Sequence, residues 1–427
     1  MSARKKRLAP QLLACALACA GAPGAPAQST DSSTSTFQVD AAIPGGNIIV
    51  VKIEDDTVYI RQDLRDTAGD WFYWHFRVRG AQGRNLKFQF TGSDVIGVRG
   101  PAVSDDGGKS WRWLGRESVS NKSFRYAFPA GAADVRFCFA MPYLESNLNE
   151  FIRRYSGDGH LRTDVLCRSK KGRDIEMLRL GRFDGQAEQR VLLTCRHHCC
   201  EMMASYVLEG MMDEVLADTD AGRWLRAHVE FLVIPFMDKD GVEDGDQGKN
   251  RRPHDHNRDY AGESIHPSVR ALRELATRWA DGKLRFALDL HCPYIRGPRN
   301  EDIYFVGGPD LENWGRVQEF ANILEQTQTG PLVFSAGHNL PFGVAWNTLL
   351  VQSSFGRWAA GLPGVRVATT LEFPYANASG RIVTAESARA LGHDLARAMR
   401  RYLEAIQDRA ENAVMVKSRF RESLVRV

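Results

Sequence analysis

Five short apolar runs after residue 147 constrain the fold of this chain most strongly. They are VLLTC (191–195), VEFLVIPFM (229–237), FALDL (286–290), IYFV (303–306) and VRVATTLEF (365–373). Each has the length of a buried strand, and the segments 201–216, 268–279 and 385–406 space their apolar residues as helices do. Apolar strands that alternate with helices predict an α/β sheet with helices on both faces.

Residues 37–142 follow a different pattern, in which apolar and polar side chains alternate as they do in half-buried strands. Phe72, Trp74 and Phe76 share one face of such a strand, and the runs around Phe88 and Phe137 repeat the alternation. Turn-rich segments such as GAQGRN separate the runs. The pattern predicts an antiparallel β-sandwich over residues 37–145, followed by an α/β domain over residues 146–410.

One hairpin of the sandwich invites a functional interpretation. SDDGGKSW (104–111) resembles the Asp-box hairpin of sialidases, which would indicate a carbohydrate-binding module. A single copy is equally a stabilised β-turn in which Asp106 bonds to its own backbone, and we favour that interpretation. We also expect Trp71 and Trp111 in the core rather than on a sugar-binding platform.

The first 27 residues have the pattern of a secretory signal. A basic cluster, the apolar run LLACALACA and small residues before Gln28 follow in that order. A linker over 28–36 and a tail over 411–427 would flank the two domains. We expect a periplasmic or secreted protein rather than a lipoprotein, because the apolar run before Cys15 is short. No later run reaches the roughly 20 residues of a membrane span.

Charge and cysteine content narrow the function further. The formal net charge of +4 over 427 residues gives no basis for nucleic-acid binding, which needs a strongly basic domain or stripe. Six cysteines follow the leader, at positions 138, 167, 195, 199, 200 and 292. In an exported chain they could form disulfides, whose connectivity the sequence does not determine.

Polar residues follow the predicted strands where a site is expected. His198 and Glu201 come after the first strand, His291 after the third and Glu372 at the end of the last. Ligands of α/β sheets collect at the carboxyl ends of the strands. Two histidines with one glutamate form an established zinc ligand set that leaves a position open for water. We therefore expect one zinc ion on His198, Glu201 and His291.

Glu372 is the candidate for a carboxylate that does not bind the metal. Zinc hydrolases need such a group to take a proton from the attacking water and to return it to the leaving amine. A glutamate at the end of the otherwise apolar segment TTLEFPY is costly to bury unless it has a partner or a function.

Four motifs, in order, resemble those of the zinc carboxypeptidases of the carboxypeptidase A clan. They are Arg196-x-His198-x-x-Glu201, the segment 237–260 that closes on Asp255-x-Asn257-Arg258, DLH at 289–291 and TLEF at 370–373. A β-sandwich before the catalytic domain is similar to the cytosolic-carboxypeptidase-like branch. The resemblance implies a mixed-sheet α/β/α domain that hydrolyses the C-terminal bond of peptides or proteins.

The resemblance also implies roles for further residues. Asn257 and Arg258 would bind the substrate's terminal carboxylate, Arg258 through a bidentate fork. A cation upstream of this pair would stabilise the oxyanion; Lys249, Arg251 and Arg252 are the candidates, and we favour Arg251. Arg357 stands where relatives place the residue that defines the specificity pocket, which suggests a preference for acidic C-terminal residues.

Several alternatives remain open from the sequence. His254, Asp255 and His256 could form a metal site of another class, but this would leave Glu201 and His291 without roles. The same ligands serve amidases that trim peptidoglycan peptides, and a binding protein could have kept the scaffold without activity. Cys199 and Cys200, between the ligands, could compete for the metal, react, pair with each other or only pack, whereas His197 is expected to face away from the metal.

Overall fold

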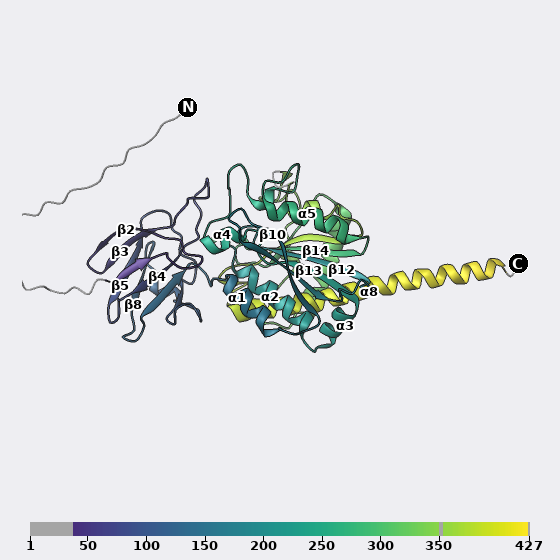
Figure 1. The fold of residues 1–427 in the computed structure, drawn as a ribbon, viewed down its shortest axis with the longest axis horizontal. Helices are drawn as coiled ribbons and strands as arrows, with labels where there is room; N and C mark the ends of the chain where they lie inside the picture. The colour runs from purple at the N-terminus through teal and green to yellow at the C-terminus, as the bar shows by residue number, and fades with distance from the viewer. Residues whose placement is uncertain (1–36, 350–352, 426–427) are drawn as a thin grey trace, which may run out of the picture. The chain divides into compact units, whose positions relative to one another are not determined.

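The computed structural model describes residues 37–349 and 353–425, so the leader and linker expected over residues 1–36 lie outside it. Two sheets form the N-terminal part of the described chain (Figure 1). One contains β1 (Gln38–Asp40), β4 (His75–Arg79), β9 (Asp134–Cys138), β6 (Ala102–Ser104) and β7 (Arg112–Trp113). The other contains β2 (Ile49–Glu54), β3 (Thr57–Arg61), β5 (Asn85–Phe90) and β8 (Ser123–Ala127).

Aromatic side chains fill the space between these two sheets. Phe76 and Phe137 from the first sheet contact Phe88 from the second, with ring centroids 5.3 and 5.2 Å from the Phe88 centroid. The predicted sandwich is confirmed, with one difference: β3 and β5 pair in parallel. Asp106 accepts hydrogen bonds from the backbone N–H groups of Lys109 and Ser110, so its turn-stabilising role is confirmed.

A seven-stranded mixed sheet forms the second part, as the predicted fold class requires. Its order is β10 (Leu161–Arg168), β11 (Asp174–Gly181), β13 (Val229–Ile234), β12 (Gln189–Cys195), β14 (Leu284–His291), β16 (Val367–Glu372) and β15 (Tyr304–Val306). The four strands β13, β12, β14 and β16 are parallel, and antiparallel pairs lie toward both edges of the sheet. The carboxyl ends of the parallel strands therefore meet at one edge.

Helices cover both faces of this sheet (Figure 1). Val191 and Leu193 of β12 belong to the core cluster that includes the helices α2 (Met203–Leu216), α3 (Asp220–His228), α6 (Leu311–Thr327) and α8 (Ala385–Val425). Leu192 points to the other face, toward α5 (Pro267–Ala280) and α7 (Phe355–Ala359). Two further helices are α1 (Glu145–Arg154), whose Leu148 and Phe151 belong to the first core cluster, and α4 (Lys239–Asp244), which follows β13 in the chain.

Helices α2 and α8 are packed backbone to backbone. A Cβ at Gly210 would lie 2.0 Å from the carbonyl oxygen of Arg389, and one at Gly392 would lie 2.2 Å from that of Val207. Only glycine permits this approach at either position. The helix expected over residues 385–406 continues to Val425.

Two further observations concern the described residues as a whole. None of their helices has the length and apolar character needed to cross a membrane. Their six cysteines are all free thiols, and five of them are buried.

Candidate active site

Three side chains converge beyond the ends of β12 and β14. The Nδ1 atoms of His198 and His291 lie 3.1 Å apart, and Glu201 places its carboxylate oxygens 3.0 Å from the first and 2.7 Å from the second. Tetrahedral zinc ligands at about 2.1 Å from the ion lie roughly 3.4 Å from one another, so the three residues fit this metal. The structure thus brings the predicted ligands His198, Glu201 and His291 together.

Arg196 shapes the turn that carries two of these ligands. Its backbone is left-handed, with φ of 61°, directly after β12 ends at Cys195. The buried guanidinium donates to the carbonyl oxygen of Cys199 at 2.9 Å and to that of Tyr143 at 2.8 Å. Because these bonds tie the turn to the segment at Tyr143 through one rigid group, the guanidinium helps to fix the turn that carries His198 and Glu201.

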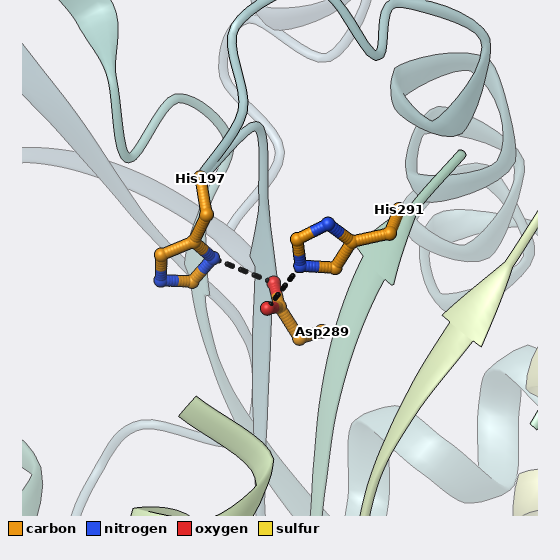
Figure 2. Close-up of side chains that lie close together, drawn as sticks. All are labelled: His197, Asp289 and His291. Carbon is orange, nitrogen blue, oxygen red and sulfur yellow. Dashed lines mark hydrogen bonds and ion pairs between the residues drawn. The ribbon is translucent and has the colours of Figure 1, made fainter. Parts of the chain in front are cut away.

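A carboxylate behind His291 fixes the orientation of its ring. Figure 2 shows Asp289 between His197 and His291, with its oxygens 2.8 Å from Nδ1 of His197 and 2.6 Å from Nε2 of His291. Metal-binding histidines commonly use their second nitrogen in this way. His197 also bonds to the hydroxyl of Tyr260, 2.7 Å away, so both of its ring nitrogens have partners other than the metal-binding residues.

The protonation of this buried group follows from its neighbours. Burial opposes a positive charge on His291, but the carboxylates of Asp289 and Glu201 outweigh it and raise the pKa of the imidazole well above its usual value. Burial likewise opposes ionisation of Glu201, yet Lys249 and the two histidines lower its pKa well below the usual value. The two shifts have one cause, because the carboxylates and the cationic groups of this buried cluster stabilise each other's charged forms.

Glu372 lies beside the metal-binding cluster without belonging to it. It is the last residue of β16 and pairs in register with His291. The side chain is buried, and its Oε2 has no hydrogen-bond partner within residues 37–349 and 353–425. Burial raises its pKa and Glu201 raises it further, against the opposing effects of His291, Lys249 and His198. A carboxylate with raised proton affinity suits a general base.

A cavity of about 580 Å³ opens onto these residues. His198, His291 and Glu372 line its floor, and Asn257, Arg258 and Arg357 line its walls, together with Lys249 and Trp71. Asn257 accepts a hydrogen bond from the backbone of Phe355 at 2.9 Å, which fixes its amide. Trp71, expected in the sandwich core, is only half-buried because it forms part of this wall.

The structure does not bring Arg251, the favoured oxyanion residue, to this cavity. Its guanidinium forms ion pairs with Asp66, Asp238 and Asp246 at 2.8 to 2.9 Å, and it lines two neighbouring cavities, one of which it shares with His198 and Lys249. Lys249 lines the main cavity instead, with Nζ 2.8 Å from Glu201. Arg252 is exposed and lines the other neighbouring cavity.

The rival metal site at residues 254–256 does not form. His254 contacts Asp259 at 2.7 Å, Asp255 accepts from the backbone of Asn257, and the His256 ring stacks on His266. His254, Asp259 and His266 could geometrically hold an ion. However, both oxygens of Asp259 already accept backbone N–H bonds, from Ile265 and His266, so this group has a role in folding the loop.

Cys199 and Cys200 are buried thiols within the turn. Burial raises the pKa of Cys200 to about 12 and that of Cys199 well above its usual value. Cys199 donates to the backbone oxygen of Asp246 at 3.0 Å. Both thiols are therefore protonated at neutral pH, and packing is the outcome among the four alternatives that agrees with their surroundings.

Two residues of the site, Asp289 and Trp71, were not assigned a role in it from the sequence. Asp289 stands two residues before His291 on one strand, so both side chains point to the same face, and that spacing could have identified it. Trp71 gave no such signal, because its part in the cavity wall depends on how the sandwich packs on the catalytic sheet.

Known proteins share these features. Residues 148–291 match the model of the zinc carboxypeptidase family. An uncharacterized protein of Zymomonas mobilis is 26% identical over 265 residues, covering 60% of this chain and 67% of that protein. Cytosolic carboxypeptidase 3 of Mus musculus is 24% identical over 66% of this chain, which spans only 31% of that longer protein.

Solved structures agree on the fold. A metallo-carboxypeptidase from Burkholderia cenocepacia superposes with a TM-score of 0.72 at 18% identity, covering 87% of this chain and all of that one. A metallo-carboxypeptidase from Pseudomonas aeruginosa gives 0.69 at 21% identity, covering 86% of this chain and 99% of that one. Residues 148–291 are therefore similar to the zinc carboxypeptidase family, and the fold of the chain is that of these metallo-carboxypeptidase structures.

Proposed function

We propose that this protein removes single C-terminal residues from peptides or proteins, with Glu372 as general base and acid. The observation that carries the proposal is the buried, unpartnered Oε2 of Glu372 on the floor of a cavity that also exposes His198 and His291. Zinc, when bound, would supply a Lewis acid for the scissile carbonyl and an acidified water. Glu372 takes a proton from the attacking water and returns it to the leaving amine, so the peptide bond breaks with one water consumed.

Asn257 and Arg258 would bind the terminal carboxylate of the substrate. Within the described chain, the Arg258 guanidinium donates to the backbone oxygen of Asn257 at 3.0 Å and forms no ion pair. Its remaining N–H groups are available for a bidentate bond to a carboxylate. A site that requires a free terminal carboxylate restricts the enzyme to the last residue of the chain.

Arg357 supports an acidic preference at that last residue. It lines the same cavity, donates to the backbone oxygen of Thr348 at 3.0 Å and lies 4.7 Å from the ring centre of Phe342. Burial and the nearby charge of Arg258 lower its pKa, so the two guanidinium groups repel each other. A substrate that carries a carboxylate for each would relieve this repulsion, as a C-terminal glutamate or aspartate does.

The protein is proposed to act outside the cytoplasm, because residues 1–27 resemble a secretory leader. Exported enzymes with these ligands can also act as amidases on peptidoglycan peptides. The two functions differ in one requirement: the carboxypeptidase needs the free carboxylate that Asn257 and Arg258 are proposed to bind.

The test uses purified protein, its zinc content, and peptides that end in Glu, Asp, Ala, Phe or Lys, each with a free or an amidated C-terminus. We expect release of the last residue from free peptides only, fastest for Glu or Asp. Glu372→Gln should lose about 1,000-fold in kcat while keeping zinc, the size of a general base contribution. Arg357→Met should remove the preference for Glu over Ala.

Two results would overturn parts of the proposal. Undiminished hydrolysis by Glu372→Gln would show that Glu372 is not the general base. Equal cleavage of amidated and free peptides would favour the amidase function. Arg278→Met, on an arginine of α5 that lies outside the cavity, is the matched control for Arg357→Met and should leave the preference unchanged.

A further inference from the structure

The loop that carries Lys249 is held by the N-terminal sandwich. The carboxylate of Asp66, between β3 and β4, accepts the backbone N–H of Gln247 at 2.9 Å and that of Gly248 at 2.8 Å. Its second oxygen also accepts from Nε of Arg251 at 2.9 Å. The carboxylate of Asp66 thus bonds to residues that precede and follow Lys249 in the chain.

Other contacts fix the same loop. Gln247 is fully buried; its amide accepts the backbone N–H of Tyr73 at 2.8 Å and donates to the backbone oxygen of Tyr73 at 2.9 Å. Ala68 donates from its backbone to the oxygen of Asn250 at 3.1 Å. Gly248 has φ of 75°, and a Cβ there would lie 2.4 Å from the backbone nitrogen of Cys199, so the loop lies directly against the metal-binding turn.

Lys249 points in the opposite direction, into the main cavity. Its Nζ lies 2.8 Å from Glu201 and 5.5 Å from the ring centre of Trp71, a second residue of the sandwich. Arg251 also lines a smaller cavity beside His198, but its guanidinium is already paired with three aspartates. The loop therefore directs Lys249 into the main cavity, whereas the guanidinium of Arg251 is bound by aspartates.

Other cations of the cavity wall have different partners. Arg296 pairs with Asp94 at 2.9 Å, and Arg299 donates to the backbone oxygen of His338 at 2.8 Å. Arg258 and Arg357 carry the proposed carboxylate sites. Among the cations in the described part of the wall, Lys249 is the one that contacts a metal ligand.

We propose that Lys249 is the catalytic cation that stabilises the oxyanion formed at the scissile carbonyl, and that Asp66 of the sandwich is its positioning residue. This inference rests on the proposed carboxypeptidase function. The ammonium group offers N–H donors beside the metal-binding cluster, where negative charge develops on the carbonyl oxygen as water attacks. The sandwich would then be part of the catalytic apparatus, through a carboxylate that never touches substrate.

The test compares kcat, KM and zinc content of the full chain and six variants on one peptide that the wild type cleaves. Lys249→Met should lower kcat about 100-fold to 1,000-fold with little change in KM, as loss of an oxyanion donor does. Lys249→Arg should recover most of the loss, because charge and donors return. Asp66→Asn should lower kcat about 10-fold, since an amide cannot accept both backbone bonds and the arginine.

A double variant separates positioning from stability. If Asp66 acts through Lys249, then Asp66→Asn lowers kcat in the wild type but not in the Lys249→Met background. Asp70→Asn is the matched control, because Asp70 lies on the same segment but bonds to Gln62 and Ser93 within the sandwich. Its kcat should equal that of the wild type.

Each outcome decides one point. An equal loss from Asp66→Asn in both backgrounds would make Asp66 merely structural, and wild-type kcat in Lys249→Met would remove the catalytic assignment. The Glu372→Gln variant distinguishes a failure of this inference from a failure of the proposed carboxypeptidase function. If that variant is inactive while Lys249→Met is active, only this inference fails; if Glu372→Gln is active, the proposed function itself fails.

Discussion

At the scale of single residues, the two cysteines in the metal-binding turn are protected by burial. A thiolate is the reactive form of cysteine, and a high pKa suppresses it. The pKa of Cys200 is raised to about 12, and the exposed fractions of Cys199 and Cys200 are 1% and 0%. Oxidation of these thiols therefore requires that the turn open first.

Alkylation measures this protection. We expect iodoacetamide at pH 8 to leave Cys199 and Cys200 unmodified in the folded protein and to modify both after unfolding, as read by peptide mass spectrometry. Cys167 is the internal control, because it is half-buried on an edge strand and should react first. Labelling of Cys200 as fast as Cys167 would show that the turn opens readily.

Sequence patterns identify some residues of the site and cannot identify others. His198, Glu201, His291 and Glu372 stand at strand ends, so strand prediction alone places them at one edge. The choice among Lys249, Arg251 and Arg252 has no local signal. It depends on Asp66, which is 185 residues away from Arg251 in the chain and reaches it only through tertiary packing.

At the scale of helices and strands, the buried parallel strands and the edge strand β15 were predictable, whereas the edge strand β10 was not. The parallel strands β12, β13, β14 and β16 are continuous apolar runs, because both of their faces are covered. Strand β10 has exposed or half-buried residues throughout, so the segment LRTDVLCR carries no comparable pattern. The parallel pairing of β3 with β5 could not be predicted either, because apolar and polar residues alternate in the same way in parallel and antiparallel pairs.

Two buried carboxylates of α2 bond to α8: Glu209, which accepts from Arg389 at 3.1 Å, and Glu214. Glu214 of α2 lies 3.0 Å from Nδ1 of His393 and 2.9 Å from Nη2 of Arg397, both on α8, and accepts from the Thr219 hydroxyl at 2.7 Å. Burial opposes its ionisation, but these hydrogen bonds outweigh it and lower its pKa from 4.5 to about 2. The ionised form therefore stabilises the folded state.

We expect Glu214→Gln to lower the free energy of unfolding at pH 7 by about 2 kcal/mol, because it breaks a buried charged network whose partners are partly solvated. A lowered folded-state pKa gives stability that is complete above 4.5 and lost as the pH falls through about 2, so the difference should shrink over that range. Denaturant unfolding at several pH values measures it.

Glu404→Gln is the matched control for this carboxylate. Glu404 forms a single, partly exposed ion pair with Arg400 one turn away on α8. Its loss should change the free energy of unfolding by less than about 0.5 kcal/mol. A pH-independent effect of Glu214→Gln would show that packing, rather than charge, joins the two helices.

At the scale of the whole chain, the sandwich and the catalytic sheet share one hydrophobic core. Phe72 lies in the sandwich, and Phe139 directly follows its strand β9. Their ring centroids lie 5.6 and 4.9 Å, respectively, from that of Tyr375, which follows β16. Arg99 and Trp113 of the sandwich also donate to Asn377 and to the backbone of Val383. Length alone predicts two domains, but it cannot predict that their apolar surfaces are continuous.

A shared core predicts that both parts unfold together. Residues 37–425 should give one calorimetric transition, with the calorimetric enthalpy equal to the van't Hoff enthalpy. Phe72→Ala should cost about 3 to 5 kcal/mol, because it leaves a cavity between four aromatic rings. Although Phe72 lies in the sandwich, the variant should lower the temperature at which zinc is released as much as it lowers the midpoint of sandwich unfolding. If the variant releases zinc at the wild-type temperature, the two domains unfold independently. The loop that carries Lys249 would then keep its position without the sandwich core.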